Sequence, residues 1–266
     1  MTLVATLFIS LFITLAFVPI LRGFALKVRI LDIPDERKVH ARPMPKIGGL
    51  AMALGFVVPI LLWLPLDRFV MAVLIGAAII VAEGFIDDKY TLGYKPKLLG
   101  QVVAALVVIL YGGVHVTSLG TLVPEGFALP WAVSLPLTLV VIVGITNAVN
   151  LADGLDGLAG GIVLISFLCI AIIAWKIGDS TVLVMSLAML GALFGFLSFN
   201  TFPASVFMGD AGSQFLGFMA IVLSLELTQG NPALSPALPL LVVGLPAIDT
   251  LLVAMERIGS GRSPFV

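Results

Sequence analysis

The chain has 266 residues, of which 60% are hydrophobic and only 11% are charged, and its mean hydropathy is +1.20. These values lie far outside the range of soluble globular domains and leave no room for a separate soluble domain. The net charge of −1 is uninformative by itself, because the distribution of charge carries the information in a membrane protein, and no nucleic-acid partner is expected.

Long apolar runs recur along the whole chain. A run of about 18 apolar residues can cross a hydrocarbon core about 30 Å thick as a helix. We therefore expect an all-α, polytopic integral membrane protein, with one transmembrane domain over residues 1–266 and about nine helices. The expected spans are 2–22, 47–64, 69–86, 98–112, 131–149, 158–175, 181–199, 214–229 and 236–255. The fourth is the weakest, because it is short and ends at two glycines.

Charge indicates the orientation of these spans. No positive residue precedes the first run, whereas Arg22 and Lys27 follow it, so we expect the N-terminus outside. All Lys and Arg except Arg68 and Lys176, 12 of 14, then fall at inside loops or span ends, which supports the span count. Five carboxylates from three distant segments also fall inside, and we interpret them as a shared cation site rather than as solvated acids at helix ends. They are Asp87, Asp88, Asp153, Asp156 and Asp210.

The first inside loop, "DIPDERKVHARPMPKIGGLAM", runs from Asp32 to Met52 and is basic. Such a loop either sets topology and touches anionic headgroups, or binds a ligand that carries phosphate. Its prolines would hold it in a defined shape, and Gly48-Gly49 would allow a close approach of backbone or ligand.

The second inside segment, "EGFIDDKYTLGYKPKLLGQ", starts at Glu83 inside a span, where an ionisable group usually faces an interior cavity. Asp87 and Asp88 are adjacent at a helix end, so their charges repel unless a cation or a lysine offsets them. Three lysines at positions 89, 95 and 97 are close enough in sequence to do so.

The third inside segment, "NAVNLADGLDGLAGG", runs from Asn147 to Gly161 and predicts a tight loop that leads into the sixth helix. Asn150, Asp153 and Asp156 are spaced by three, so they would share a face if they lay on one helical turn. An ordinary polar turn between helices is the alternative. No Gly-Lys-Ser/Thr follows, which excludes a Walker phosphate loop.

The fourth inside segment, "SFNTFPASVFMGDAGSQFLGF", runs from Ser198 to Phe218. Asp210 lies in a glycine-containing turn that opens the eighth helix, either as a simple N-cap or as part of the acidic cluster. Phe207 just before it either contacts lipid or core, or stacks on a nucleobase.

The strings "HARPMPKIGG", "DDKY", "KPKLLGQ", "NAVNLADGLDGLAGG" and "FMGDAGS", in this order and on one side of the membrane, resemble the polyprenyl-phosphate N-acetylhexosamine-1-phosphate transferases of glycosyltransferase family 4. The resemblance covers nearly the whole chain. It implies an enzyme that moves a sugar 1-phosphate from a UDP-N-acetylhexosamine to a polyprenyl phosphate lipid and releases UMP. It also implies Mg²⁺, for which Mn²⁺ could substitute, at a site on the cytoplasmic face of the bacterial inner membrane.

The resemblance assigns roles to individual residues. It implies that Asp210 and Asn150 bind the metal, and that Asp87 and Asp88 handle the lipid phosphate. By the same resemblance, uridine would contact Asp153, Asn200 and Phe207, and phosphate would meet Arg42 and Lys97. Asp156 stays in the cluster without a settled role. The expected catalytic set is Asp87, Asp88, Asp156 and Asp210.

The first-loop pattern resembles that of family members which use UDP-N-acetylglucosamine more than that of members which use the UDP-muramoyl-pentapeptide. The resemblance therefore implies the former donor, and transfer of phospho-N-acetylmuramoyl-pentapeptide is the alternative. A cation-coupled transporter would need acids near the bilayer midplane, whereas most of these acids lie at one boundary. An anchor protein without chemistry would not explain five converging acids.

The resemblance departs from the family at the C-terminus. Family members continue past a segment like Gly261–Phe265 into a histidine-rich loop and a tenth helix, while this sequence stops at Val266. We therefore expect either that the sequence is a fragment or truncation, or that the protein lacks part of the sugar site. A homodimer is left open.

Overall fold

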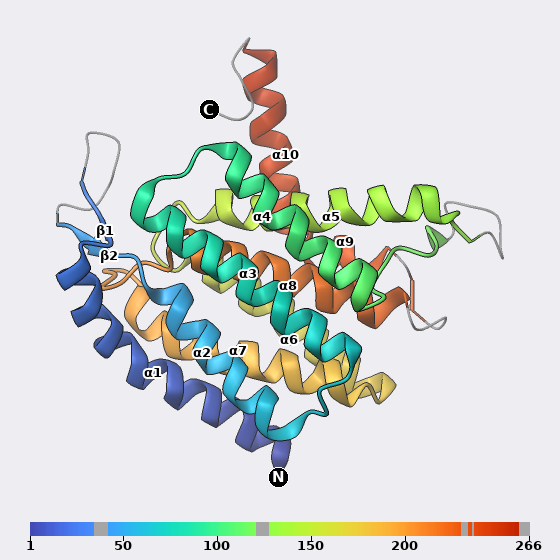
Figure 1. The fold of residues 1–266 in the computed structure, drawn as a ribbon, viewed down its shortest axis with the longest axis horizontal. Coiled ribbons are helices and arrows are strands. Elements are labelled where there is room, and N and C mark those ends of the chain that lie inside the picture. The colour runs from blue at the N-terminus through green and yellow to red at the C-terminus, as the bar shows by residue number, and fades with distance from the viewer. Residues whose placement is uncertain (35–41, 121–127, 230–233, 236, 261–266) are drawn as a thin grey trace.

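The computed structural model describes residues 1–34, 42–120, 128–229, 234–235 and 237–260. Helices dominate this part of the chain (Figure 1). The helices are α1 (Thr2–Val28), α2 (Gly48–Trp63), α3 (Arg68–Tyr90), α4 (Tyr94–Leu106), α5 (Trp131–Ala152), α6 (Leu158–Ile177), α7 (Ser180–Asn200), α8 (Gly209–Gln229), α9 (Leu238–Val242) and α10 (Gly244–Gly259). A π-helical turn, η1 (Val107–Tyr111), extends α4, and two short strands are β1 (Leu31–Asp32) and β2 (Met44–Pro45).

Seven helical segments among the described residues are long and apolar enough to cross a membrane. The fourth expected span is one of them, because α4 and η1 together form a segment from Tyr94 to Tyr111. The second, α2, is a shorter apolar helix of 16 residues. An all-α, polytopic membrane protein is thereby confirmed, while the number of spans and the outside N-terminus stay predictions.

The expected span over residues 236–255 is wrong as one continuous helix. The structure breaks it at Val243, between α9 and α10. Pro246 has no N–H to donate to the carbonyl of Val242, and Ser166 of α6 fills the vacant position, since its Oγ donates to that carbonyl at 2.6 Å. After the break, α10 contacts α5 and stands out from the body of the bundle (Figure 1).

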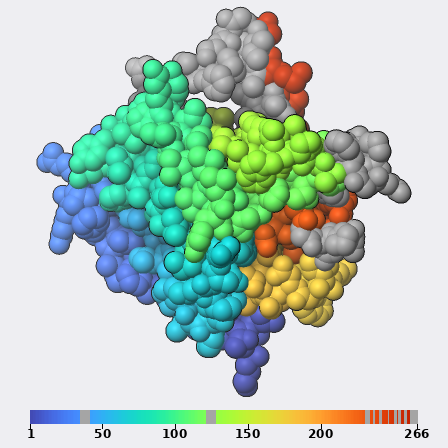
Figure 2. Space-filling model, turned by 45° about the vertical axis from the view of Figure 1, so that its right-hand side comes forward, coloured from blue at the N-terminus to red at the C-terminus, as the bar shows by residue number. Residues whose placement is uncertain are grey.

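Helix α8 forms the centre of the bundle, with nearly all of its residues buried. It packs against α2, α3, α5 and α6. On the face shown in Figure 2, α3, α4 and α5 cover most of the surface, and α8 is visible only as a small orange area. Helix α8 is therefore largely surrounded by neighbouring helices, and Gly209 and Asp210 in its first turn are only partly buried.

Helix α1 packs along α7 and α2 through small and hydroxyl-bearing residues. Ser10 is fully buried, and its Oγ donates to the carbonyl of Ala188 in α7 at 2.6 Å. Small residues and interhelical hydrogen bonds typically hold membrane helices together, because lipid offers no hydrophobic driving force between them. Helices α1 and α7 lie on the side of the bundle away from α4 and α5 (Figure 1).

The four segments predicted to lie inside meet at one end of the bundle, near β1 and β2 (Figure 1). The two strands pair antiparallel, with Leu31 opposite Pro45. The N–H of Phe207 donates to the carbonyl of Pro45 at 2.9 Å, and the N–H of Gly48 donates to the carbonyl of Phe207 at 3.0 Å. These bonds fix the first inside segment against the one that precedes α8.

Candidate active site

Asp210 lies in the first turn of α8, directly after Gly209, whose φ of +70° favours glycine. The buried carboxylate of Asp88 accepts the backbone N–H of Asp210 at 2.9 Å and that of Ala211 at 3.1 Å. The first N–H groups of a helix have no partner within the helix, so Asp88 satisfies two of them for α8. Asp88 therefore links α3 to the start of α8.

This contact requires α3 and α8 to lie very close together. A Cβ atom added at Gly84 of α3 would lie only 2.4 Å from the Cα of Ala211. Gly84 is one turn before Asp88, so the absence of a side chain there allows the Asp88 carboxylate to reach the α8 backbone.

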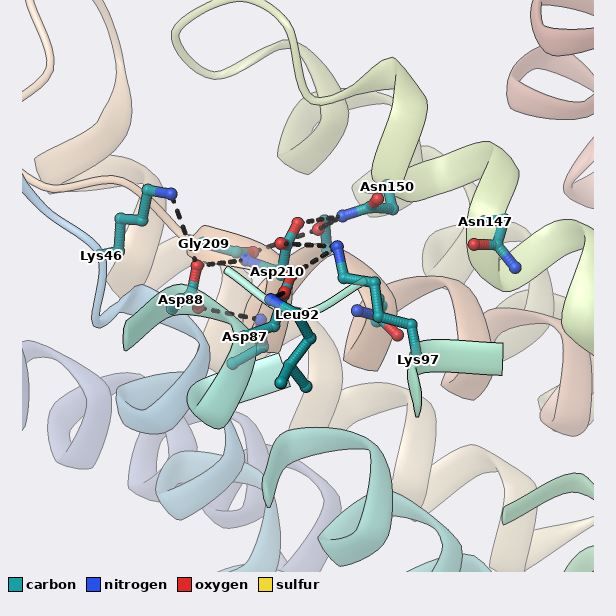
Figure 3. Close-up of polar contacts among 12 residues, drawn as sticks. Lys46, Asp87, Asp88, Leu92, Lys97, Asn147, Asn150, Gly209 and Asp210 are labelled. Atoms are coloured by element: carbon teal, nitrogen blue, oxygen red, sulfur yellow. Dashed lines mark hydrogen bonds and ion pairs between the residues drawn. The ribbon is translucent and has the colours of Figure 1, made fainter. Parts of the chain in front are cut away.

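Lys97 joins two of the aspartates. Its ammonium forms an ion pair with Asp87 and lies 3.1 Å from Oδ2 of Asp210 (Figure 3). The other two lysines of this segment lie over tyrosine rings instead, Lys89 over Tyr90 and Lys95 over Tyr94. Of the three lysines considered from the sequence, Lys97 is thus the one that contacts the acidic pair.

Asn150, from the C-terminal end of α5, reaches Asp210 from the other side (Figure 3). Its Nδ2 donates to Oδ1 of Asp210 and to Oγ of Ser213, both at 2.7 Å. Asp210 is therefore held by α4 through Lys97, by α5 through Asn150 and by α3 through the backbone contact with Asp88.

A cavity of about 900 Å³ opens beside Asp210. Most of the site residues expected from the sequence line it, whereas Asp87, Asp88 and Lys97 do not line it but contact Asp210. The expected residues in the lining are Arg42, Asn150, Asp153, Asp156, Asn200, Phe207 and Asp210. The structure thus brings the predicted site residues together from four distant segments.

Two of these residues also hold the cavity walls in place. Asn200 is 3% exposed, and its amide accepts the N–H of Gly157 and donates to the carbonyl of Val206, both at 3.0 Å. The carboxylate of Asp156 accepts the N–H of Ala204 at 2.9 Å. Together they join the loop after α5 to the segment before α8.

Asn150, Asp153 and Asp156 face the same cavity, but not because they lie on one helical turn, as their spacing suggested. Helix α5 ends at Ala152, and residues 153–157 form the predicted loop, so the three side chains do not share one helical turn. They line the same cavity because the loop curves around it. Burial, together with the charges of Asp210 and Asp156, raises the pKa of Asp153 to about 7, and Lys46 acts in the opposite direction.

Two charged residues of the cavity lining were missing from the sequence-based set of site residues. Lys46 and Asp32 both line the cavity and lie 3.5 Å apart as an ion pair, and Lys46 is also 3.8 Å from Asp88. A signal for Lys46 existed, because it directly precedes Ile47-Gly48-Gly49 in the basic loop. Asp32 had no such signal, since its position depends on the pairing of β1 with β2.

The donor set around Asp210 fits a hard cation that also binds phosphate. Among the described residues, no group of three or more His, Cys, Asp and Glu side chains is placed to hold a metal ion alone. Mg²⁺ is usually held by one or two carboxylates together with substrate phosphates and water. The Asp210 carboxylate, 27% exposed on the cavity side, provides one such ligand, and the amide oxygen of Asn150 provides another if its amide group turns over.

Comparison with known proteins shows which family the chain matches. Residues 70–228 match the family described as Glycosyl transferase family 4. A Bacillus subtilis protein named probable undecaprenyl-phosphate N-acetylglucosaminyl 1-phosphate transferase is 38% identical over 96% of this chain and 72% of its own length. The Escherichia coli K12 undecaprenyl-phosphate alpha-N-acetylglucosaminyl 1-phosphate transferase is 31% identical, over 98% and 73%. A Mycolicibacterium smegmatis decaprenyl-phosphate N-acetylglucosaminephosphotransferase is 35% identical, over 91% and 67%.

Proposed function

The chain belongs to glycosyl transferase family 4, and we propose that it transfers N-acetylglucosamine 1-phosphate from UDP-N-acetylglucosamine to polyprenyl phosphate, with release of UMP. The observation that carries the proposal is the group of Asp87, Lys97, Asn150 and Asp210 beside a large cavity whose lining includes acidic and basic side chains. The names of the relatives favour N-acetylglucosamine over the muramoyl-pentapeptide donor. The gathering of the acids at one end of the bundle disfavours a transporter.

The nucleotide would occupy the cavity, with uracil stacked on Phe207 and bonded by Asp153. Arg42 and Lys46, which line the same cavity, would neutralise the diphosphate. Phosphoryl transfer depends mainly on positioning and on neutralising charge, so a cavity that combines basic, acidic and aromatic side chains suits it.

Mg²⁺ would be held by Asp210, with Asn150 beside it and the diphosphate oxygens completing the shell. When bound, the ion neutralises charge on the diphosphate and on the leaving UMP. Lys97 and Asp87 would receive the lipid phosphate, Lys97 by charge and Asp87 by taking up its proton. A phosphate oxygen of the lipid then attacks the β-phosphorus, and the bond from this phosphorus to the bridging oxygen breaks as UMP leaves.

This reaction requires the cavity to face the compartment that contains the UDP-sugar. The polar end of the bundle, where β1–β2 and the loops meet, would therefore lie on the cytoplasmic face of the bacterial inner membrane. The lipid phosphate would reach Lys97 from the surrounding bilayer.

The test uses membranes that contain the chain, polyprenyl phosphate and UDP-N-acetylglucosamine labelled in the sugar. We expect labelled lipid and UMP to form only with Mg²⁺ or Mn²⁺, and Asp210→Ala to lower the rate about a hundredfold or more. The control is Asp67→Ala, which removes another acid at a helix start, because Asp67 caps α3 and does not line the cavity.

An unchanged rate in Asp210→Ala would show that the assigned metal site is wrong. Faster transfer from the UDP-muramoyl-pentapeptide than from UDP-N-acetylglucosamine would overturn the choice of donor.

A further inference from the structure

A second tier of polar side chains lies one helical turn below the site residues. Residues three or four apart lie on the same helix face, and each of four helices carries such a pair. The pairs are Lys97 and Gln101 in α4, Asn150 and Asn147 in α5, Asp210 and Gln214 in α8, and Asp87 and Glu83 in α3. We call Gln101, Asn147 and Gln214 the amide tier.

The amide tier is internally hydrogen-bonded. Nε2 of Gln101 donates to Oε1 of Gln214 at 2.8 Å and to Oδ1 of Asn147 at 3.2 Å, and Nδ2 of Asn147 donates back to Oε1 of Gln101 at 2.6 Å. Gln101 is 2% exposed and Gln214 is 1% exposed. Gln101 is therefore the central member, bonded to both of the others.

These bonds are difficult to replace. In the interior of a membrane bundle no bulk water is present to satisfy an amide that has lost its partner, so an orphaned group is costly. Removing the Gln101 amide would leave polar atoms of both Asn147 and Gln214 without that partner. The relative positions of α4, α5 and α8 at this depth therefore depend on Gln101.

The tier differs from the other buried polar contacts by the helices that it joins. Thr146 and Thr228 donate to carbonyls of their own helices, and Ser10 joins α1 to α7, which hold neither Lys97 nor Asp210. The amide tier joins the three helices that carry Lys97, Asn150 and Asp210, one turn from where these three residues meet.

Helix α3 is attached differently. Both carboxyl oxygens of Glu83 are buried, and the side chain lies beside Gln214 of the amide tier without a hydrogen bond of good geometry among the described residues. Glu83 also packs so tightly on α4 that a Cβ atom at Gly100 would lie 2.7 Å from its Cγ. The polar link from α3 to α8 is instead the contact of Asp88 with the α8 backbone. The tier thus orders one side of Asp210, and Asp88 orders the other.

We propose that Gln101 is a positioning residue, which holds Lys97, Asn150 and Asp210 in the geometry that binds the cation and the two phosphates. The inference rests on the function proposed above. Outer partners that orient a metal ligand typically change affinity or activity about 10- to 100-fold when they are removed.

The experiment compares Gln101→Leu, which keeps the volume but removes the amide, with Ser10→Ala, which also removes a buried interhelical hydrogen bond. Transfer is measured for Gln101→Leu, for Asn150→Ala and for the double variant. A second readout without turnover is the rise in unfolding temperature that Mg²⁺ and UMP cause in the purified protein.

We expect Gln101→Leu to lower kcat/KM about 10- to 100-fold and to reduce the rise caused by Mg²⁺ and UMP, while Ser10→Ala lowers only the basal unfolding temperature. The double variant should lose less than the product of the single losses, because both changes act on one group of residues. If Gln101→Leu does not fold, Gln214→Leu removes one of the bonds and is measured in the same way.

Two results separate the possible failures. If the wild type transfers sugar phosphate but Gln101→Leu behaves like Ser10→Ala, or if the losses of Gln101→Leu and Asn150→Ala multiply, the positioning role is overturned. If the wild type neither transfers sugar phosphate nor responds to Mg²⁺ and UMP, the proposed function itself is overturned.

Discussion

The neighbouring carboxylates Asp87 and Asp88 make different contacts, although the family resemblance gives them a common role. Asp87 forms an ion pair with the Lys97 side chain and also accepts the N–H of Leu92 at 2.5 Å, whereas Asp88 accepts two N–H groups from the start of α8. Asp88 is also fully buried at its side chain. Its contacts are those of a residue that holds α8 in place.

Asp88→Asn should therefore destabilise the protein more than Asp87→Asn. An asparagine at position 88 would point its NH₂ group at one of the two backbone donors, and losing such a cap typically costs about 1–2 kcal/mol. Thermal unfolding followed by circular dichroism in detergent measures the difference. Asp87→Asn should instead lower the transfer rate with a smaller change in unfolding temperature, and equal unfolding temperatures for the two variants would contradict this division.

At the scale of helices, the site depends on how closely α3 approaches α8. In Gly84→Ala, the new Cβ would meet backbone atoms of Ala211, which cannot rotate away, so the helices must separate. Overpacking of this kind typically costs about 1–3 kcal/mol. Separation would also break the contacts of Asp88 with α8, so transfer activity should fall with stability.

Gly144→Ala is the matched control, because it also adds a methyl group to a glycine within a membrane helix, but nothing lies within 4 Å of the new atom. Alanine is favoured over glycine in a helix by up to about 1 kcal/mol, so this variant should be as stable as the wild type or more stable. Activity assays and unfolding curves for both variants decide the matter. A Gly84→Ala protein with wild-type activity would show that the close approach is not needed.

The sequence predicts helices well where apolar length determines them, and less well where a single residue interrupts the pattern. The run over 236–255 is apolar enough for one span, but Pro246 removes a hydrogen-bond donor, and the carbonyl that is released bonds to Ser166, 76 residues earlier. Local hydropathy cannot include such a partner. In the same way, the role of Gly84 is set by Ala211, which lies on another helix.

At the scale of the whole molecule, charge distribution indicated the site before any contact was known. The segregation of Lys and Arg predicted that five aspartates lie on one side of the membrane. In the structure three of them line one cavity, and Asp87 and Asp88 contact Asp210, which is one of those three. The partners within the site could not be predicted. Lys97 rather than Lys89 or Lys95 reaches Asp87, and Asn200 bonds to loops on both sides of the cavity, because tertiary packing decides these contacts.

The same charge distribution makes a prediction about how the molecule lies in the membrane. Tyr94 and Ser180 are both exposed first residues of helices, Tyr94 beside the site and Ser180 directly after the hairpin turn that joins α6 to α7. Lys and Arg gather on the side of Tyr94, which the positive-inside rule assigns to the cytoplasm. Tyr94→Cys and Ser180→Cys are made in a Cys169→Ser background, since Cys169 is the one cysteine of the sequence.

A thiol reagent that cannot cross membranes should label Ser180→Cys in intact cells, and should label Tyr94→Cys only after the cells are opened. Lysed cells are the control for the reactivity of both thiols. Labelling of Tyr94→Cys in intact cells would place the cavity outside, where a cytoplasmic UDP-sugar could not reach it. Since Asp87, Lys97 and Asp210 are all at this end of the bundle, the orientation of the whole molecule decides which nucleotide pool the site can use.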